Sequence, residues 1–332
     1  MPDRSSRFKV VLAMLVMYVV WGTTYLAIKV GLDAQLPPSL FAGVRQIPAA
    51  ALLFGFAAMR RSTLRISLHD LRISAIVGIL LICGGQYGTF LAERSIPSGI
   101  SALVVALLPL WIALAESLFP DMQRPGRVGW LGLAVGFSGL GILMWPRLVG
   151  QGAGVGELAG IGTQILGTWL WASGSIYSKR RRPIADNIVM TAYEMLIAGA
   201  VLIALGTALG EWPSFHLQGK GFWALAYLSI VGSAVAFTAF TYALKHLPAS
   251  KVMTYAYVNP VIAVFAGALA GRVGLVPPEP ITVSTLVGMV VIVGGVALTT
   301  ASPTLPPRRP PAAPEDVVLS EAPLIEPEPS EV

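Results

Sequence analysis

Two ionisable residues, Arg45 and Glu194, lie within long runs of apolar residues. An ionised side chain in an apolar interior is expensive, so each is a candidate for function. We interpret Arg45 as a group that binds anions or carboxylates at the outer end of its segment; snorkelling to an interface or capping of carbonyls is the alternative. Glu194 is the candidate for proton coupling or for binding a substrate ammonium, and a protonated structural residue is its alternative.

Uncharged polar and aromatic side chains inside other apolar runs form a second set of candidates. Aromatic rings with a few hydroxyls and amides are typical of a largely apolar binding cavity with a few orienting hydrogen bonds. Helix–helix hydrogen bonds and interfacial aromatic belts use the same residue types and are the alternative. The candidates for a substrate-binding cavity are Trp21, Thr24, Tyr25, Gln86, Tyr87, Trp171, Ser173, Tyr177, Thr241, Tyr242, Tyr255 and Asn259.

Two prolines, Pro109 and Pro260, lie in the middle of apolar runs. A proline inside a helix removes one backbone hydrogen bond, frees a carbonyl and allows a bend. We therefore predict hinges at both positions.

The sequence offers little support for catalysis. It has no phosphate-binding G-x-x-x-x-G-K-[ST] loop, and its three histidines, His69, His216 and His246, fall between the apolar runs. The single Cys83 cannot form an intramolecular disulfide or a thiolate cluster. We predict no catalytic residue, no metal and no cofactor, and an enzyme embedded in the membrane is the less favoured class.

Composition indicates that lipid is the solvent around these residues. Hydrophobic residues make up 55% of the 332 positions and charged residues only 12%, whereas soluble domains carry about 25% charge. The apolar runs are each about 20 residues long, which is the length of a helix that crosses a ~30 Å hydrocarbon core. We predict an all-α integral membrane protein with ten transmembrane helices. Their approximate ranges are 10–30, 40–59, 73–91, 99–118, 128–145, 157–177, 187–209, 222–244, 252–271 and 281–300.

The distribution of Lys and Arg predicts the orientation. Of the 23 Lys and Arg residues, 17 fall in the N-terminal arm, in every second connection and in the C-terminal tail, and four fall in the alternate connections. The positively charged side of a membrane protein faces the cytoplasm. Both termini are therefore predicted to be cytoplasmic, and the net charge of +6 indicates topology rather than binding of nucleic acid.

An internal repeat with an offset of ~150 residues divides the chain into two halves. Residues 21–29 align with 171–179, residues 96–99 align with 247–250, and Pro109 aligns with Pro260. Because each half has five spans, the second half must enter the membrane upside down. Inverted repeats place a site near the midplane between the halves, and rocking of the halves gives alternating access.

These boundaries define four regions of the chain. They are a cytoplasmic arm at 1–9, five-helix repeats at 10–146 and 155–301, and a tail at 302–332. The tail is rich in Pro and acidic residues and has too few hydrophobic residues to pack, so we predict that it is disordered and cytoplasmic.

The order and duplication of the motifs resemble the EamA family of the drug/metabolite transporter superfamily. Residues 21–29, with Pro37-Pro38 and residues 42–45, resemble its opening helices. Residues 96–99 leading to Pro109, and residues 247–250 leading to Pro260, resemble its signature helix in each half. Members commonly carry Gly-Glu after that helix, but here residues 118–122 read LFPDM and residues 270–274 read AGRVG. A coupling role for those acids is therefore not transferred.

The resemblance implies a multi-pass protein of the cell membrane with a central cavity lined by helices other than the fifth and tenth. It implies a secondary transporter that exports small organic metabolites, such as amino acids or related compounds. A passive channel and an uptake carrier are the alternatives. The implied partners are a small-molecule substrate, with proton coupling through Glu194 as a hypothesis, and the lipid bilayer; no nucleic acid and no cofactor is implied.

Overall fold

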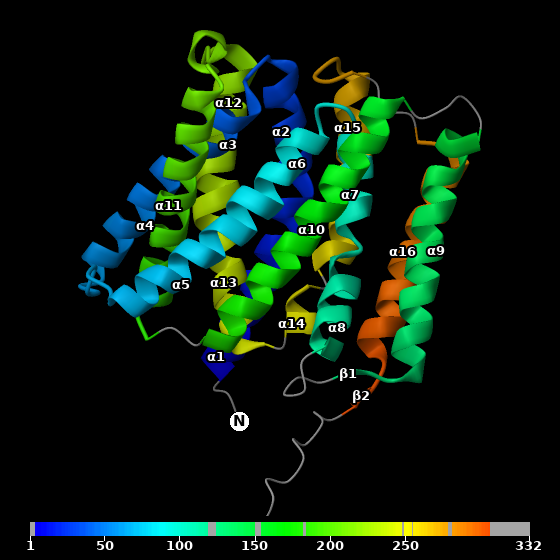
Figure 1. Ribbon diagram of the computed structural model, residues 1–332, viewed down its shortest axis with the longest axis horizontal. Coiled ribbons are helices and arrows are strands. Elements are labelled where there is room, and N and C mark those ends of the chain that lie inside the picture. The colour runs from blue at the N-terminus through cyan, green and yellow to red at the C-terminus, as the bar shows by residue number, and fades with distance from the viewer. Residues whose placement is uncertain are drawn as a thin grey trace, which may run out of the picture.

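The computed structural model describes residues 4–118, 124–149, 154–181, 184–247, 249–253, 255–277 and 281–305. These residues form a helical bundle with one two-residue ladder, in which β1 (Arg124–Pro125) pairs antiparallel with β2 (Thr304–Leu305) (Figure 1). Most of the predicted disordered tail, from residue 306 onward, lies outside the described residues, as does Pro248 of the repeated motif. The predicted helical membrane fold is confirmed at this level.

Helices cover most of each predicted segment in the first half. The first helix is continuous and comprises α1, η1 and α2. The third helix comprises α5, η2 and α6, and the fourth comprises α7 and α8. The middle stretches η1 and η2 of the first and third helices are π-helical. The elements are α1 (Arg4–Val16), η1 (Met17–Trp21), α2 (Gly22–Asp33), α3 (Pro38–Val44), α4 (Gln46–Met59), α5 (Leu68–Gly78), η2 (Ile79–Gln86), α6 (Tyr87–Ala92), α7 (Ser98–Val105), α8 (Leu108–Leu118) and α9 (Arg127–Val149).

The second half repeats this order. Its elements are α10 (Val155–Arg181), α11 (Asn187–Ala208), the short η3 (Trp212–Ser214), α12 (Gly219–Tyr227), η4 (Leu228–Val235), α13 (Ala236–His246), α14 (Ala249–Val252), α15 (Tyr255–Arg272) and α16 (Val283–Ala301). The stretch η4 is π-helical, and it lies ~150 residues after the π-helical η2.

Local signals explain several helix boundaries. The side chains of Ser67, Asp186 and Thr282 cap α5, α11 and α16 by accepting a hydrogen bond from a backbone N–H in the first turn. The first helix begins at Arg4, six residues before the predicted start near residue 10. The predicted arm at 1–9 therefore contains helical residues, because basic side chains can continue a helix beyond the apolar layer.

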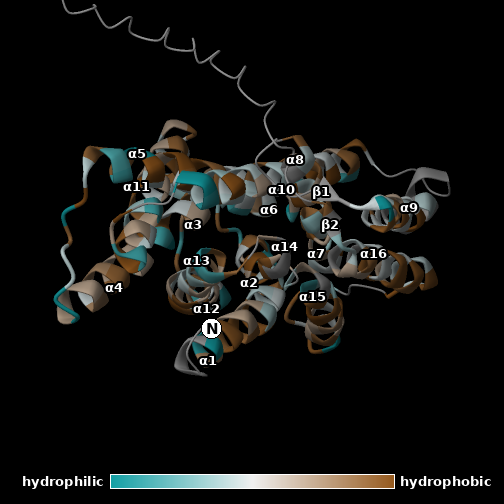
Figure 2. Ribbon diagram, turned by 90° about the horizontal axis from the view of Figure 1, so that it is seen from below, coloured by the Kyte–Doolittle hydropathy of each residue, from teal (hydrophilic) through white to brown (hydrophobic). Residues whose placement is uncertain are grey.

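The outward surfaces of the bundle are apolar. Trp223, Leu269 and Val290 are 72%, 63% and 68% exposed. Figure 2 shows hydrophobic residues along α4, α15 and α16, whereas hydrophilic ones gather in connections such as that between α4 and α5. Within the described residues, six helices are long and apolar enough to cross a membrane; they are Arg7–Asp33, Pro38–Met59, Leu68–Ala92, Ser98–Ala115, Asn187–Ala208 and Gly219–His246.

Helices at equivalent positions of the repeat pack in matching pairs. The first helix packs against α12 and α13, and the third helix packs in the same way against α10. The pairs α4–α11, α7–α15 and α9–α16 each join a helix to its own repeat equivalent. Such a set of contacts is expected of a twofold relation between the two halves.

The equivalent helices run in opposite directions. In Figure 1 the third helix rises from α5 at the lower end to α6 at the upper end, whereas its equivalent descends from α12 to α13. The first described helix, α1, and the last element, β2, lie at the same lower end. We call this the lower end and the opposite one the upper end.

Close backbone contact holds α9 to α16. A Cβ atom built on Gly295 would lie 2.3 Å from the backbone nitrogen of Gly136 and 2.7 Å from the carbonyl oxygen of Gly132. Thr299 Oγ1 also donates to the Gly129 carbonyl oxygen across this contact at 3.2 Å. Glycine is therefore required at position 295 so that the two helices can approach.

We expect Gly295→Ala to lower the stability of the protein, because the methyl group must push two backbones apart. An overpacked contact of this kind costs about 1–3 kcal/mol. Thermal unfolding of purified protein in detergent measures the effect. The neighbouring Gly294→Ala is the matched control, since a Cβ atom at Gly294 meets nothing within 4 Å. An equal melting temperature for both variants would contradict the packing described here.

Candidate functional site

A cavity lies at the centre of the bundle, between the two halves. Its atom-free space, counted to its opening, is about 580 Å³. Residues from both halves line it, and none of them belongs to α9, α11 or α16. The lining residues are Trp21, Thr24, Tyr25, Ile28, Arg45, Gly85, Gln86, Thr89, Val105, Leu108, Gln164, Gly167, Thr168, Trp171, Gly232 and Tyr255.

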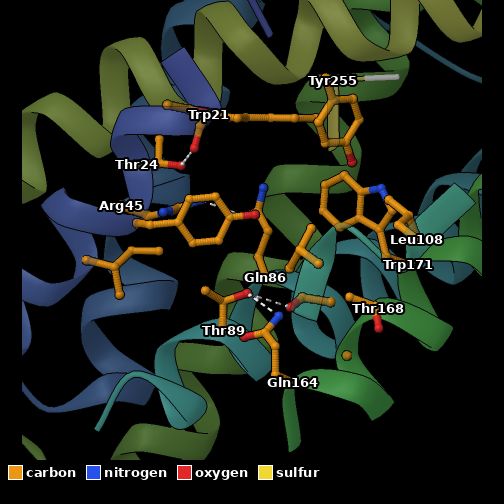
Figure 3. Close-up of a pocket in the computed structure, with 16 residues that line it drawn as sticks. Trp21, Thr24, Arg45, Gln86, Thr89, Leu108, Gln164, Thr168, Trp171 and Tyr255 are labelled. Atoms are coloured by element: carbon orange, nitrogen blue, oxygen red, sulfur yellow. Dashed lines mark hydrogen bonds between the residues drawn. The ribbon is translucent and has the colours of Figure 1, made fainter. Parts of the chain in front are cut away.

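Aromatic rings form one wall of the cavity. Trp21 and Trp171 occupy equivalent positions of the repeat and meet edge to face, with ring centroids 5.4 Å apart. Tyr255 packs on Trp21 at 4.8 Å, and the fully buried Phe240 lies 5.3 Å from each tryptophan. Figure 3 shows Trp21 and Tyr255 side by side, with Trp171 beneath Tyr255. The two halves therefore meet through rings that also face the cavity.

Arg45 faces the cavity from the opposite side. It lies between α3 and α4 and is only 3% exposed, so it is buried in the lining rather than at the outer mouth, where we expected it. The reason is that the helix begins at Pro38, about two turns above Arg45, which carries the guanidinium inward. Arg45 Nη2 donates to Gln86 Oε1 at 2.6 Å, and the guanidinium lies 5.1 Å from the Phe90 ring centroid.

Two nitrogen atoms of Arg45 remain without a partner. Among the described residues, Nε and Nη1 are buried and make no hydrogen bond. A guanidinium has five N–H donors, and a buried donor without a partner is unfavourable. The cavity thus presents an incompletely satisfied cation to whatever enters it.

An amide network forms the lower part of the view in Figure 3. Gln164 Nε2 donates to Thr89 Oγ1 at 3.2 Å, and Ser101 Oγ donates to Gln164 Oε1 at 2.9 Å. These bonds join α6 of the third helix, α7 of the fourth helix and α10, the sixth helix, around the cavity. Gln164 and Thr89 were not among the predicted cavity residues. The sequence signal for Gln164 is a polar amide inside the apolar run that begins at residue 157.

The π-helical stretches shape the backbone beside the cavity. Gly85 of η2 lies so close to Trp171 that a Cβ atom would be 2.7 Å from the indole ring. On the other side, the carbonyl of Gly232 in η4 accepts a hydrogen bond from Trp21 Nε1 at 3.2 Å. Short π-helical turns often occur at functional sites, and here both widen the helix next to a lining tryptophan.

Glu194 is buried but does not line the cavity. It is 4% exposed on α11, and its Oε2 atom has no hydrogen-bond partner among the described residues. A Cβ atom on Gly78 would lie 2.6 Å from the Glu194 carbonyl oxygen, so its backbone packs against the third helix. Within the described part of the chain, Glu194 forms no ion pair with Arg45.

Seven of the predicted cavity residues do line the cavity: Trp21, Thr24, Tyr25, Arg45, Gln86, Trp171 and Tyr255. Of the other six, Tyr87, Thr241 and Asn259 hold helices together. Tyr87 and Ser39 share a hydrogen bond between their hydroxyl groups at 2.8 Å. Thr241 Oγ1 accepts from Asn187 Nδ2 at 2.9 Å and lies 3.0 Å from Thr191 Oγ1. These three residues are not among the lining residues, and their polar atoms are used between helices.

The remaining three, Ser173, Tyr177 and Tyr242, also lie outside the lining. Ser173 Oγ donates to the carbonyl of the preceding turn, at Trp169. The Tyr177 ring packs under the Arg181 guanidinium at 5.3 Å, and the Tyr242 ring packs on His246 at 4.2 Å. Both tyrosines therefore lie near the lower ends of their helices.

Asn259 joins α15 to the first helix by backbone contacts. With its amide turned so that Nδ2 donates, it reaches the carbonyl oxygens of Tyr18 and Tyr255 at 3.1 Å each. Asn259 is fully buried. Its role is therefore to hold the lining helices rather than to face the cavity.

The two predicted hinge prolines differ in their surroundings. The fourth helix breaks at residues 106–107, directly before Pro109, so that α7 and α8 are separate. Pro260 lies inside the continuous α15. The hinge role of both remains a prediction.

A lysine at the end of the first helix of each half contacts the end of the third helix. Lys29 Nζ donates to the Glu93 carbonyl oxygen at 3.3 Å and pairs with Asp33 at 3.3 Å. In the second half, Lys179 Nζ donates to the carbonyl oxygens of Leu244, at 2.8 Å, and Leu247. A cation at a helix C-terminus is favourable, and here it joins two lining helices at each end of the bundle.

Glu211, which the sequence reasoning did not single out, holds the upper end of α3. It lies in the connection after α11, and its carboxylate accepts from Leu40 N at 2.8 Å, Ser39 Oγ at 2.9 Å and Ser39 N at 3.4 Å. A carboxylate at a helix N-terminus is stabilised by the free N–H groups there. Lys29, Glu93 and Arg94 lie in the same charged depression, which therefore marks the upper approach to the bundle.

The chain is similar to a family of membrane transporters. A family model described as the EamA-like transporter family matches residues 8–145 and 158–301. A protein of Escherichia coli (strain K12) named as the inner membrane transporter YedA is 33% identical over 304 residues, which cover 91% of this chain and 94% of that protein. The transporter YvbV of Bacillus subtilis (strain 168) is 27% identical over 301 residues, covering 88% of this chain and 91% of that protein.

A solved crystal structure has the same fold. It covers 90% of this chain and 97% of its own, with a TM-score of 0.64 and 22% sequence identity. At this identity the likeness concerns the fold alone.

We expect Glu211→Ala to destabilise the upper end of the bundle, because it removes charge-assisted hydrogen bonds to Ser39 and Leu40. Bonds to a charged group contribute about 1.5–3 kcal/mol each when shielded and less near water, so the apparent melting temperature in detergent should fall measurably. Ser214→Ala in the same connection is the control, since Ser214 is exposed. A melting temperature unchanged in both variants would rule out the role given to Glu211.

Proposed function

The chain belongs to the EamA-like transporter family, as its motifs predicted, and on that basis we propose that it is a secondary transporter for a small organic metabolite. Transport proceeds by alternating access through the central cavity and moves the solute out of the cell. The observation that carries the proposal is the position of the cavity, which is lined by residues of both halves, including Trp21 and Trp171 at equivalent positions of the repeat.

We propose ten transmembrane helices arranged as two oppositely oriented five-helix repeats, at 10–146 and 155–301. The two stretches matched by the family model support the repeat, and the opposed directions of the third helix and its equivalent support the inversion. Both termini are cytoplasmic on this proposal, because the lower end carries most of the Lys and Arg residues. The protein resides in the inner membrane, the location given in the name of its relative YedA.

Buried phenylalanines favour a carrier over a passive channel. Phe90 packs against Arg45 on the upper side of the cavity, and Phe240 packs against both tryptophans on the lower side. Both rings are fully buried and neither lines the cavity, so each packs behind a lining residue. On the proposed mechanism these packed layers must rearrange when the cavity opens to either side of the membrane.

We expect purified protein in proteoliposomes to show counterflow. Compounds are first selected by thermal stabilisation from a panel of amino acids and related organic acids and amines, because a bound solute raises the melting temperature. Vesicles loaded with an unlabelled, stabilising compound should accumulate the labelled compound transiently. Equal uptake by loaded and empty vesicles would indicate a channel and overturn the carrier mechanism.

We propose Glu194 as the group that couples transport to protons. Among the described residues, one oxygen of its buried carboxylate has no hydrogen-bond partner. Glu194 lies on α11 above Thr191 and Asn187, which extend toward the lower end. Polar side chains at successive turns of one helix face, at 187, 191 and 194, offer a route from the cytoplasmic side.

We expect Glu194→Gln to abolish the dependence of transport on pH and on a proton gradient, while counterflow of the solute is retained. Uptake into proteoliposomes across a range of pH measures both. Asp186→Asn is the control on the same helix, because Asp186 is exposed and asparagine is an equally good cap for α11. A pH profile unchanged by Glu194→Gln would remove Glu194 from the coupling mechanism.

A further inference from the structure

We propose that the transported solute is an organic monoanion, with its carboxylate on Arg45 and Gln86 and its uncharged body against Trp21, Trp171 and Tyr255. This inference rests on the proposed transport function and names the substrate class. It distinguishes carboxylic acids from free amino acids, which carry an additional ammonium group, and from amines.

The cavity offers donors that only an acceptor can satisfy. Arg45 Nε and Nη1 are buried without a hydrogen-bond partner among the described residues, and Arg45 itself belongs to the lining. In Figure 3 the Gln86 amide nitrogen points into the same space, and it makes no hydrogen bond with the described residues. A carboxylate accepts hydrogen bonds through both oxygens and donates none, so it matches these groups.

The amide oxygens of the lining are already occupied. Gln86 Oε1 accepts from Arg45 Nη2 at 2.6 Å and from Gln46 Nε2 at 3.0 Å. Gln164 Oε1 accepts from Ser101 Oγ at 2.9 Å. An ammonium group, which only donates, therefore finds at Gln86 an amide oxygen that already accepts two hydrogen bonds.

Among the described residues, the lining contains no carboxylate. Arg45 is the one formally charged residue of this described lining, and the buried Glu194 lies outside it. A cationic solute would face Arg45 at short range with no carboxylate among the described lining residues to pair with it, and a zwitterion would leave its ammonium without a partner of opposite charge in that lining. The aromatic rings could attract a cation, but the unscreened guanidinium opposes it. A monoanion instead makes the loaded cavity neutral.

The rest of the lining fits an uncharged, largely apolar body. The rings of Trp21, Trp171 and Tyr255 form one wall, and Ile28, Val105 and Leu108 add aliphatic surface. The hydroxyl groups of Thr24 and Thr168 donate to carbonyl oxygens of their own helices at 2.8 and 2.7 Å. Burial of the apolar surface of a solute against this lining is favourable, whereas burial of a further charge is not.

A series of compounds with one body and four head groups tests the inference. The probes are 3-phenylpropanoate, 3-phenylpropan-1-ol, 3-phenylpropylamine and phenylalanine, with hexanoate, hexan-1-ol and hexylamine as an aliphatic series. Binding at neutral pH is measured by thermal stabilisation of wild-type protein and by competition in counterflow. We expect the carboxylate to bind about tenfold or more tightly than the alcohol, the amine and phenylalanine, since a charge-assisted hydrogen bond contributes at least that factor.

Variants assign the preference to one residue. Arg45→Gln should remove the advantage of the carboxylate over the alcohol, and Arg45→Lys should retain part of it. Arg94→Gln is the matched control, because Arg94 lies in the charged depression outside the cavity and the preference should persist. The order of head groups in wild-type protein tests the inference even if a variant fails to fold.

The outcomes separate the two proposals. Tighter binding of phenylalanine or of the amines, or binding of no carboxylate in either series, would overturn the monoanion inference while leaving a carrier in place. Binding of the carboxylate through Arg45 without counterflow would support the site and overturn the transport mechanism.

Discussion

A guanidinium that is shielded from water must be solvated by the protein around it, and the centre of this bundle is arranged to do so. Arg45 is stabilised by one amide oxygen of Gln86 and by the face of Phe90, which together replace only part of its hydration. In a hydrocarbon surrounding such a deficit is costly, so the position must be held by contacts that prevent the side chain from escaping to an interface. Gln46 fixes Gln86, and the α4–α11 contact fixes Gln46.

The remaining helices serve this centre in different ways. The π-helical stretches η2 and η4 bring backbone close to the two tryptophans, and the amide network of Gln164 holds the third, fourth and sixth helices around them. The pair α9–α16 contributes no lining residue and is joined by backbone contact through Gly132 and Gly295. The lining helices can therefore change position while that pair stays together.

The fold could be predicted from sequence because its signals are long and redundant. Apolar runs, alternating basic connections and the repeat each point to the same helices. The site was harder to predict, since a helix surrounded by lipid and other helices is apolar on all sides. Its pattern of polar residues therefore does not show which face points toward the cavity. Gln86 and Tyr87 are adjacent in sequence, but one faces the cavity and the other faces Ser39. Gln164 could not be predicted for the same reason, since it lies within the apolar run 157–177 and the sequence does not show which side of that helix faces the cavity.

The opposite charges at Arg45 and Glu194 have an energetic consequence, because they occupy equivalent positions in the two repeats. If the halves were identical, exchanging their conformations would convert the outward-open state into the inward-open state, and the two states would be degenerate. The lysine contacts at Lys29 and Lys179 preserve this equivalence. On the proposed alternating-access mechanism, a cation in one half and an acid in the other make the two open states unequal in energy, in addition to the differences between the two scaffolds.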